Sequence, residues 1–385
     1  MSKTITIGTV TSQPGTIQYG QWDALKHPTG HTEFLPIIIA QGREDGPCLW
    51  CTAGIHGPEQ AGPLVLYKLI TQDLVDRMKG TIVGIPGLNP AGLRTSKREP
   101  YHAPKDPNRL WPDGKPEKPQ DPDKEAPSSL ELAYKRFFED YLLPGADYLI
   151  DYHNASIGSI SFAFRDRVLY RADQPPFLSP SNGGGGKGGK AEAEAMSAKL
   201  DEMLQAYGHT TINEFPAEKY IDEKLHRSTS GAALLIGKIP AFTVELGGGQ
   251  MPDPTIVAAS AAGTRNVMRW AGMLDGDPEP IEGIKVVDPG FPVRRRNAPR
   301  ASEACVAIHL VASGDIVKVG DPVAEVRDVW GRPLGDGLLR SEYDGFVIGR
   351  AHGIYFYPGD KVLSMAIRDE EPLVGPYPEN YFKKD

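Results

Sequence analysis

The stretch GPCLWCTAGIHGPEQAG at residues 46–62 decides the fold, because it joins an apolar run to the start of a helical pattern. The run is short and bounded by glycine, as in a strand that is covered on both faces. From Glu59 to Met78 apolar residues recur at helical spacing, and GTIVGIPGLNP at 80–90 predicts the next strand. This strand–helix–strand order predicts a parallel sheet with covering helices.

Further along the chain the same alternation of strands and helices recurs and then stops. A helix is predicted at about 129–143, and buried strands are predicted within GADYLIDYHNA (145–155) and GKIPAFTVELGGG (237–249). After the acidic, proline-containing link at 274–283 only short β runs with turn glycines follow, which predicts a small all-β domain. We therefore divide the chain into a first domain, 1–278, and a second domain, 279–385.

Bulk composition excludes several classes of function. The net charge of −8 over 385 residues argues against nucleic acid or an acidic membrane as the main partner, and we expect the basic run at 293–300 to be a solvated face. Three cysteines are too few for a disulfide framework, and Cys48 and Cys51 fit buried core thiols. With neither a signal pattern nor a membrane-length apolar run, we expect a cytoplasmic protein, with a homo-oligomer left open.

Two segments do not fit the predicted pattern of strands and helices. The proline-rich and charged segment at 98–128 is long for a loop, and such loops are usually functional or disordered. The glycine-rich stretch SNGGGGKGGKA at 181–191 nearly matches a phosphate-binding loop, but its last position is alanine where Ser or Thr would bind magnesium. We interpret it as a surface loop.

Three predicted strands end in groups that bind metals or move protons. CTAGIHGPE brings His56 and Glu59, and LIDYHNA brings His153. Loops after parallel strands meet at one edge of a sheet, so these side chains are expected to converge. Two histidines and one glutamate that leave a position for water are the ligand composition of catalytic zinc sites in metallopeptidases.

Two further acidic residues suit this site. Glu245 ends the strand TVE before three glycines, and it is our candidate for the general base that takes a proton from water. Asp151 lies two residues before His153, so both side chains point to the same side of a strand. We expect Asp151 to accept the other N–H of a histidine ligand, with His56 as the favoured partner.

With these residues in place, the chain resembles the succinylglutamate desuccinylase/aspartoacylase family, relatives of the zinc carboxypeptidases. AGIHGPE, DYHNA and TVELGGG are similar to its metal and catalytic motifs and occur in the same order. The resemblance implies one Zn²⁺ per chain on His56, Glu59 and His153, with Glu245 catalytic. It also implies a mixed, largely parallel, carboxypeptidase-like sheet and a C-terminal barrel related in shape to lipoyl and biotinyl domains.

The resemblance also covers the block between these motifs. NPAGLRTSKR at 89–98 and DPNR at 106–109 are similar to the family's Asn-Pro…Arg…Asn-Arg block. By that match Arg98 would stabilise the oxyanion of the scissile carbonyl, and Asn108 and Arg109 would hold the carboxylate of the amino-acid part. Arginine grips carboxylates through two parallel hydrogen bonds, which agrees with this assignment. By a looser match, Arg227 would contact the substrate's side chain or acyl group.

These observations favour a zinc-dependent amidohydrolase that deacylates a small N-acyl amino acid. A metallocarboxypeptidase acting on a peptide C-terminus could use nearly the same residues. The third alternative is a metal-binding relative that has no catalytic activity.

Overall fold

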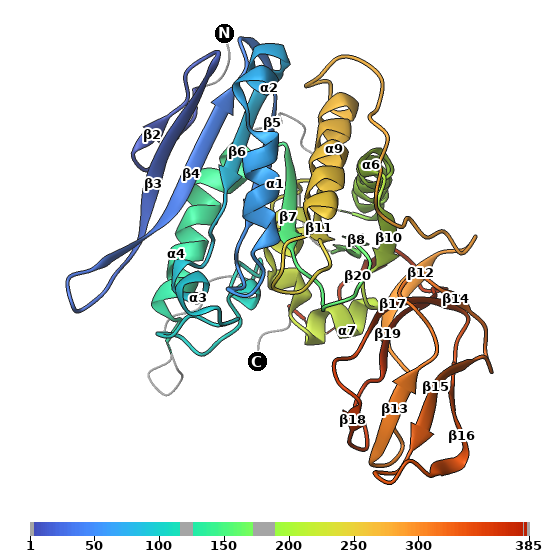
Figure 1. The fold of residues 1–385 in the computed structure, drawn as a ribbon. Coiled ribbons are helices and arrows are strands. Elements are labelled where there is room, and N and C mark those ends of the chain that lie inside the picture. Colours follow the sequence, from blue (N-terminus) through green and yellow to red (C-terminus); the bar gives the residue numbers. More distant parts are fainter. Residues whose placement is uncertain (1–3, 116–125, 172–188, 380, 383–385) are drawn as a thin grey trace.

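The computed structural model describes residues 4–115, 126–171, 189–379 and 381–382. A helix-covered α/β body carries the N-terminus, and a smaller β-rich lobe built from the C-terminal part of the chain lies beside it (Figure 1). Residues 116–125 of the proline-rich segment and 181–188 of the glycine-rich stretch lie outside the described residues.

One twelve-stranded mixed sheet runs through the body and into the lobe. In spatial order its strands are β14 (Ile316–Val317), β17 (Gly345–Arg350), β19 (Leu363–Arg368), β12 (Val293–Asn297), β10 (Thr210–Asn213), β8 (Phe162–Arg165), β11 (Ala241–Glu245), β7 (Tyr148–His153), β5 (Glu44–Ala53), β6 (Lys79–Ile85), β4 (Thr32–Gln41) and β3 (Thr16–Lys26). The central strands β11, β7, β5 and β6 are parallel, whereas β3, β4 and the strands of the lobe pair antiparallel. The predicted mixed α/β sheet is confirmed, with parallel strands at its centre.

Helices cover both faces of this sheet. They are α1 (Ala61–Leu69), α2 (Gln72–Arg77), α3 (Pro90–Thr95), α4 (Ser129–Phe137), α5 (Leu143–Gly145), α6 (Lys190–Tyr207), α7 (Ala217–Asp222), α8 (Thr229–Leu235) and α9 (Pro254–Trp270), with short helical turns η1 (Pro107–Arg109), η2 (Phe138–Leu142) and η3 (Leu225–Arg227). Figure 1 shows α1, α9 and α6 beside one another, and α9 contacts both of its neighbours. On the other face, α4 packs near β3 and β5, and α8 packs on β7 and β11.

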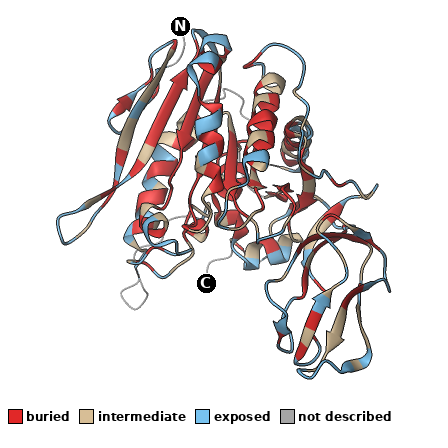
Figure 2. Ribbon diagram, in the orientation of Figure 1, coloured by how far each residue is buried: buried red, intermediate tan, exposed pale blue. Residues whose placement is uncertain are grey.

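Strand β5 explains why its sequence is apolar without alternation. The ring of Trp50 packs against Phe137 of α4 on one face, with ring centroids 5.9 Å apart. Cys51 points to the other face, toward Tyr152, whose hydroxyl lies 2.5 Å from that of Thr264 in α9. Both faces of the central strands are therefore buried, as Figure 2 shows. Cys48 and Cys51 are both buried, which confirms the expectation for these two thiols.

The helix predicted from Glu59 to Met78 is two helices instead of one. Helix α1 ends at Leu69, and Thr71 adopts an extended backbone with its hydroxyl accepting from the Leu74 N–H at 3.3 Å. A threonine in this position caps the start of a new helix. The apolar periodicity continues across this break because both helices cover the same sheet face.

The lobe has a second sheet that stacks on the end of the large one. Its strands are β16 (Pro333–Arg340), β15 (Pro322–Arg327), β13 (Cys305–His309) and β18 (Tyr355–Phe356). Ala307 and Val323 from this sheet share a core with Val347, Leu363 and Met365 from the large sheet. This arrangement agrees with the expected small all-β region after the link at 274–283.

Four short strands complete the description of the fold. Strands β1 (Thr6–Ile7) and β2 (Val10–Thr11) form a hairpin, and β20 (Val374–Pro376) pairs with β9 (Val168–Tyr170). The β20–β9 pairing returns the chain from the lobe to the body.

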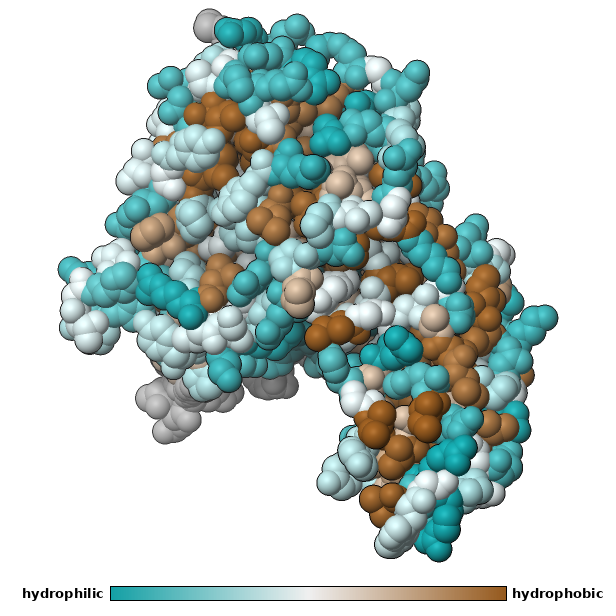
Figure 3. Space-filling view, viewed as in Figure 1, coloured by the Kyte–Doolittle hydropathy of each residue, from teal (hydrophilic) through white to brown (hydrophobic). Residues whose placement is uncertain are grey.

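The described helices include none that is both long and apolar enough to cross a membrane. Hydrophobic atoms do gather on the lower part of the lobe in Figure 3. Ile308 and Tyr355, on the neighbouring strands β13 and β18, are exposed in this region of the fold.

Candidate active site and metal centre

Two histidines and one glutamate converge where β5 and β7 end. The chain turns after β5 with the Glu59 N–H donating to the His56 carbonyl at 3.0 Å, which places both side chains before helix α1. His153 is the last residue of β7. The Nδ1 atoms of His56 and His153 lie 2.8 and 2.7 Å from the two carboxylate oxygens of Glu59. One ligand atom from each of the three residues lies within 4.8 Å of the others, so the group could hold a metal ion.

A second carboxylate stands behind each imidazole. His153 Nε2 lies 2.9 Å from Asp151 Oδ2, and His56 Nε2 lies 3.0 Å from Asp106 Oδ1. The expected pairing of Asp151 with His56 is therefore wrong, because both histidines have their own carboxylate. The fully buried Asp151 also accepts from the hydroxyl of Thr52 on the neighbouring strand at 2.6 Å. Such outer carboxylates fix the orientation and tautomer of a ligating histidine.

Asp106 is a site residue that the sequence analysis did not select. It begins the DPNR motif, and this position in the motif is the sequence feature from which its role could have been inferred. Its other oxygen accepts from Arg98 Nη2 at 2.8 Å. Burial opposes ionisation of Asp106, but hydrogen bonding to His56 and the charges of His56 and Arg98 hold its pKa well below the usual range.

The electrostatics of the cluster favour a cation between its carboxylates. Burial works against a charge on His153, but Asp151 and Glu59 outweigh it and raise the His153 pKa well above its usual value. Burial likewise opposes ionisation of Glu59, and the two imidazoles lower its pKa far below normal. A group of residues that stabilises positive charge to this degree also suits a divalent ion at the same atoms.

Glu245 lies beside the cluster, opposite His153 in the parallel pairing of β11 with β7. Its Oε2 is buried without a hydrogen-bond partner in the described structure. Burial raises the pKa of Glu245 to about 7, and the charge of Glu59 adds to this effect. A carboxyl group with a pKa near 7 can both accept and return a proton at neutral pH.

The three glycines after Glu245 shape the adjoining turn. Gly247, Gly248 and Gly249 all have positive φ, between 62° and 69°. A Cβ on Gly249 would lie 2.3 Å from Ile157 Cγ1. The amide of Asn154 closes the turn by donating to the carbonyls of Gly247 and Gly249. Only glycine fits this close, left-handed path.

Arg98 reaches the cluster from the loop that follows α3. Besides binding Asp106, its Nη1 lies 3.5 Å from Glu59 Oε1. The side chain remains 44% exposed, so its guanidinium is accessible to a ligand at the mouth of the site. The structure thus brings Arg98, Glu59 and Asp106 together at one edge of the cluster.

Comparison with known proteins shows which family the part of the chain around the site matches. Residues 45–172 match the model of the succinylglutamate desuccinylase/aspartoacylase catalytic domain. The chain is also 26% identical over 375 residues to the N-alpha-acetyl-L-2,4-diaminobutyric acid deacetylase of Halomonas elongata, with 93% of this chain and 94% of that protein covered. Residues 45–172, which carry the three candidate metal ligands, thus belong to the succinylglutamate desuccinylase/aspartoacylase catalytic-domain family.

Solved structures of this family share the fold. The succinylglutamate desuccinylase/aspartoacylase of Rhodobacter sphaeroides is 20% identical with a TM-score of 0.65, covering 92% of this chain and 96% of its own. The product-bound ectoine utilization protein EutE of Ruegeria pomeroyi is also 20% identical, with a TM-score of 0.62, covering 91% and 95%. At this identity the likeness concerns the fold alone.

The Asn-Arg pair of the desuccinylase/aspartoacylase motif lies against the same cluster. Asn108 is buried, with Nδ2 3.4 Å from His153 Nε2, and its Oδ1 accepts from the Thr229 N–H at 2.9 Å. The guanidinium of Arg109 donates to the carbonyls of Glu223 and Asn108, both at 2.7 Å. These bonds hold Arg109 in a fixed orientation near Arg98 and Asp106, whose charges act on it.

Arg227 is not brought to the metal-ligand group. Its Nε donates to the Trp111 carbonyl at 2.9 Å, and its Nη2 pairs with Glu131 of α4 at 2.6 Å. These contacts connect η3 to Trp111 within the proline-rich segment and to α4. The predicted contact of Arg227 with substrate stays a prediction.

Arg294 and Arg295 contradict the expectation of a solvated basic run. Arg294 lies 3.6 Å from Asp369, and Arg295 Nε lies 2.8 Å from Glu214. Arg295 also stacks over the ring of Phe215 at 4.0 Å. Both arginines stand on β12 in the large sheet, where buried carboxylates surround them.

Two buried carboxylates, Asp166 and Glu214, lie close to Arg295. Ser230 connects Asp166 to β11, because its hydroxyl lies 2.9 Å from that of Thr243 and 3.1 Å from Asp166 Oδ2. Burial raises the pKa of Asp166 to about 7, and the neighbouring Glu214 adds to the effect. The charge of Arg295 acts on Glu245 as well as on Asp166. No motif in the sequence marked these residues, which come from separate helices, strands and loops.

Proposed function

We propose that this chain is a zinc-dependent deacylase that hydrolyses the amide bond of a small N-acyl amino acid. The observation that carries the proposal is the convergence of His56, Glu59 and His153 beside the buried carboxyl of Glu245. The match of residues 45–172 to the desuccinylase/aspartoacylase catalytic domain supports it. The deacetylase from Halomonas elongata, which aligns over nearly the whole chain, supports it further.

The donor set fits one zinc ion per chain. His56, Glu59 and His153 would hold it, while Asp106 and Asp151 accept from the outer nitrogens of the imidazoles. When bound, zinc lowers the pKa of water and polarises a carbonyl. Imidazoles that are already oriented lose less conformational freedom when they bind zinc. The two outer carboxylates therefore raise the affinity of the site for zinc.

Glu245 moves the proton during the reaction. Its carboxylate takes a proton from the attacking water, and the oxygen of that water bonds to the amide carbon. Glu245 then returns the proton to the amide nitrogen, and the C–N bond breaks to give a carboxylate and a free amine. Its pKa of about 7 suits both directions of transfer.

Arginine side chains stabilise the substrate and the developing charge. Arg98, at the exposed edge of the cluster, stabilises the negative charge on the carbonyl oxygen as water adds. Asn108 and Arg109 bind the carboxylate of the amino-acid part. Arg227 would contact the substrate only if its pairing with Glu131 opens.

We propose further that the amino acid carries a second positive charge on its side chain. Two buried carboxylates, Asp166 and Glu214, lie beside one guanidinium, Arg295, whose charge also acts on Glu245. A substrate ammonium group would complete the charge balance, since buried carboxylates are stable only when paired. The name of the Halomonas elongata relative, a diaminobutyric acid deacetylase, describes a substrate with such an amine.

The two parts of the chain take different roles in this proposal. We assign catalysis to residues 1–278 and pocket closure to residues 279–385, with Arg295 as the contribution of the second part. We further propose that the two stacked sheets of the lobe form a flattened barrel of the lipoyl/biotinyl kind. Cys48, Cys51 and Cys305 are buried and form no disulfide in the described structure, which fits the proposed reducing cytoplasm.

Metal analysis combined with an activity screen tests the function. We expect turnover of acetylated diamino acids to disappear in Glu245→Gln while bound metal is retained, because only the proton carrier changes. Glu282→Gln, an exposed site in the link, is the matched control and should leave turnover unchanged. Preference for dipeptides or longer peptides would instead indicate a carboxypeptidase, and tight metal binding without hydrolysis across the panel would indicate a non-catalytic relative.

A further inference from the structure

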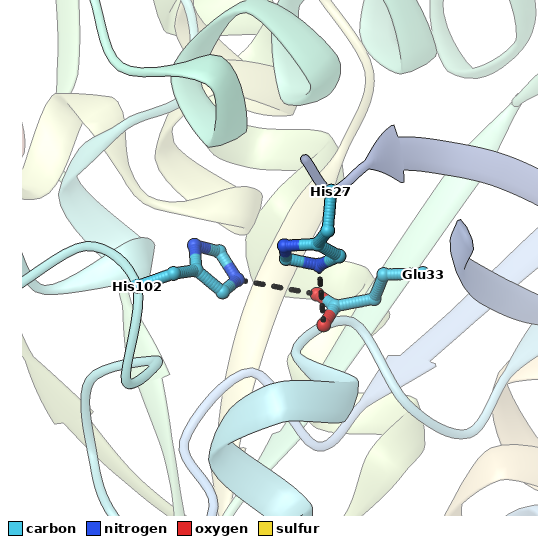
Figure 4. A group of neighbouring side chains, drawn as sticks. All are labelled: His27, Glu33 and His102. Carbon is cyan, nitrogen blue, oxygen red and sulfur yellow. Dashed lines mark ion pairs between the residues drawn. The ribbon is translucent and has the colours of Figure 1, made fainter. Parts of the chain in front are cut away.

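Three side chains outside the active site converge in the same manner as a metal site. His27 directly follows β3, Glu33 lies on β4 across the hairpin turn, and His102 comes from the loop between α3 and η1 (Figure 4). The hairpin is closed by the His27 N–H donating to the His31 carbonyl at 2.8 Å. Figure 4 shows both imidazoles directed at the carboxylate of Glu33.

The distances in this group are too long for hydrogen bonds and suit a shared ion. His27 Nε2 lies 3.7 Å from Glu33 Oε2, and His102 Nε2 lies 3.6 Å from Glu33 Oε1. Nitrogen and oxygen ligands of one tetrahedral zinc ion, at about 2.0–2.2 Å, would lie about 3.3–3.6 Å from one another. One ligand atom from each residue lies within 4.8 Å of the others.

All three inward atoms lack partners. His27 Nε2, His102 Nε2 and Glu33 Oε2 are buried atoms without a hydrogen bond in the described structure. Native proteins rarely leave three such atoms facing one another, because each unpaired buried polar group is costly. The catalytic cluster differs, since its imidazoles and Glu59 are already at hydrogen-bond distance.

The charge of Glu33 also requires a cation. Its side chain is only 2% exposed, and its ion-pair contacts within the described residues are to the two imidazoles. Neither imidazole reaches it at hydrogen-bond distance, so the buried carboxylate has no close counter-charge. A divalent ion between the three residues would supply that charge and satisfy all three unpaired atoms.

We propose that His27, Glu33 and His102 bind a second divalent transition-metal ion, of the zinc class, separate from the catalytic site. The nitrogen-rich donor set favours zinc over magnesium or calcium, which prefer oxygen ligands. Ring contacts hold the histidines in place, because Tyr101 stacks on His27 with centroids 6.3 Å apart and meets His102 edge-on at 5.2 Å.

The ion would fasten a functional loop to a rigid hairpin. His102 lies midway between Arg98 and Asp106, the two loop residues that contact the catalytic cluster. Hairpin β3–β4 belongs to the edge of the large sheet, so the ion would connect this loop to the sheet. The effect on Arg98 rests on the proposed function, whereas metal binding by the three residues does not.

Metal content of the purified full-length chain tests the site. After saturation with Zn²⁺ and removal of free metal, we expect about two zinc ions per chain in the native protein and about one in His102→Ala. His31→Ala is the matched control, because His31 sits in the same turn and stacks on His27 without contacting Glu33. This control should retain both ions.

A thermal measurement separates the new site from the catalytic one. In His56→Ala, which disables the catalytic cluster, added Zn²⁺ should still raise Tm, because ligand binding to the folded state stabilises it. The double variant His56→Ala/His102→Ala should lose this shift, and circular dichroism checks that both variants fold. One zinc per native chain, or an unchanged zinc content in folded His102→Ala, would overturn the site. Two ions in a chain without deacylase activity would uphold the site and overturn only the proposed function.

Discussion

Asp106 Oδ1 lies 3.0 Å from His56 Nε2, across 50 residues of sequence, and its other oxygen binds Arg98. A single carboxylate thus orients a proposed metal ligand and a proposed oxyanion-stabilising residue at once. The buried Asp151 does the corresponding work for His153 alone.

Replacing Asp106 by Asn should weaken metal binding and catalysis together. Loss of an outer-sphere carboxylate of this kind costs about 10–100-fold in metal affinity or activity. We expect a fall of that size in zinc affinity, measured by competition with a chromophoric chelator, and a parallel fall in kcat/KM. Asp277→Asn, at an exposed position in the link, is the control. An Asp106→Asn enzyme with native zinc affinity would show that His56 does not need this carboxylate.

Replacing Asp166 by Asn should change substrate choice more than rate. The variant removes one of the two carboxylates proposed to meet the substrate ammonium, while Ser230 and Thr243 remain. We expect KM for an acetylated diamino acid to rise by about tenfold, the effect of one lost charge pair of about 1.4 kcal/mol. KM for the acetylated amino acid with a neutral side chain should change little. Equal changes for both substrates would argue against a cation-binding pocket.

Because His209 is buried, we predict that the free energy of unfolding decreases in acid. Burial lowers the pKa of His209 to about 4, and its Nε2 has no hydrogen-bond partner in the described structure. Between pH 6.5 and 4 the unfolded chain takes up a proton that the folded chain does not, so stability falls as the pH falls. At pH 4 this group alone removes about 3 kcal/mol, and above pH 6.5 it removes nothing.

Urea unfolding of His209→Gln across this pH range measures the effect. The variant should lose stability less steeply than the native chain between pH 6.5 and 4, whatever its stability at pH 7. His352→Gln, at an exposed position, should keep the native slope. Parallel slopes for native protein and His209→Gln would assign the acid sensitivity to other groups.

Asp369 should contribute strongly to stability. Its carboxylate pairs with the fully buried Arg167 at 2.8 Å and also accepts from Asn213 at 2.6 Å. Asp369→Ala leaves the Arg167 guanidinium buried without a counter-charge, which typically costs about 3–5 kcal/mol. Denaturant unfolding should show a loss of this size, whereas the exposed neighbour Glu370→Ala should be nearly neutral. A small loss of stability in Asp369→Ala would mean that hydrogen bonds to backbone carbonyls are enough to stabilise the buried Arg167 guanidinium.

Much of the fold could be predicted because its signals are local. The apolar run before Gly54 and the strand ending at His153 follow from burial on both faces of β5 and β7. The missed break between α1 and α2 came from Thr71, whose capping role is hidden when apolar periodicity continues past it. The basic run was misjudged because Arg295 finds Glu214 only through the pairing of distant strands.

The sequence by itself determined which strands end in ligand-type side chains, since periodicity and turn residues depend on neighbours a few positions away. Only the tertiary structure decided which carboxylate serves which histidine, because strand register and loop path bring Asp151 to His153 and Asp106 to His56. The group of His27, Glu33 and His102 also appears only there. The hairpin turn that carries His27 and Glu33 and the loop that carries His102 lie some 70 residues apart in the sequence. Only folding brings the three side chains close enough to bind one cation.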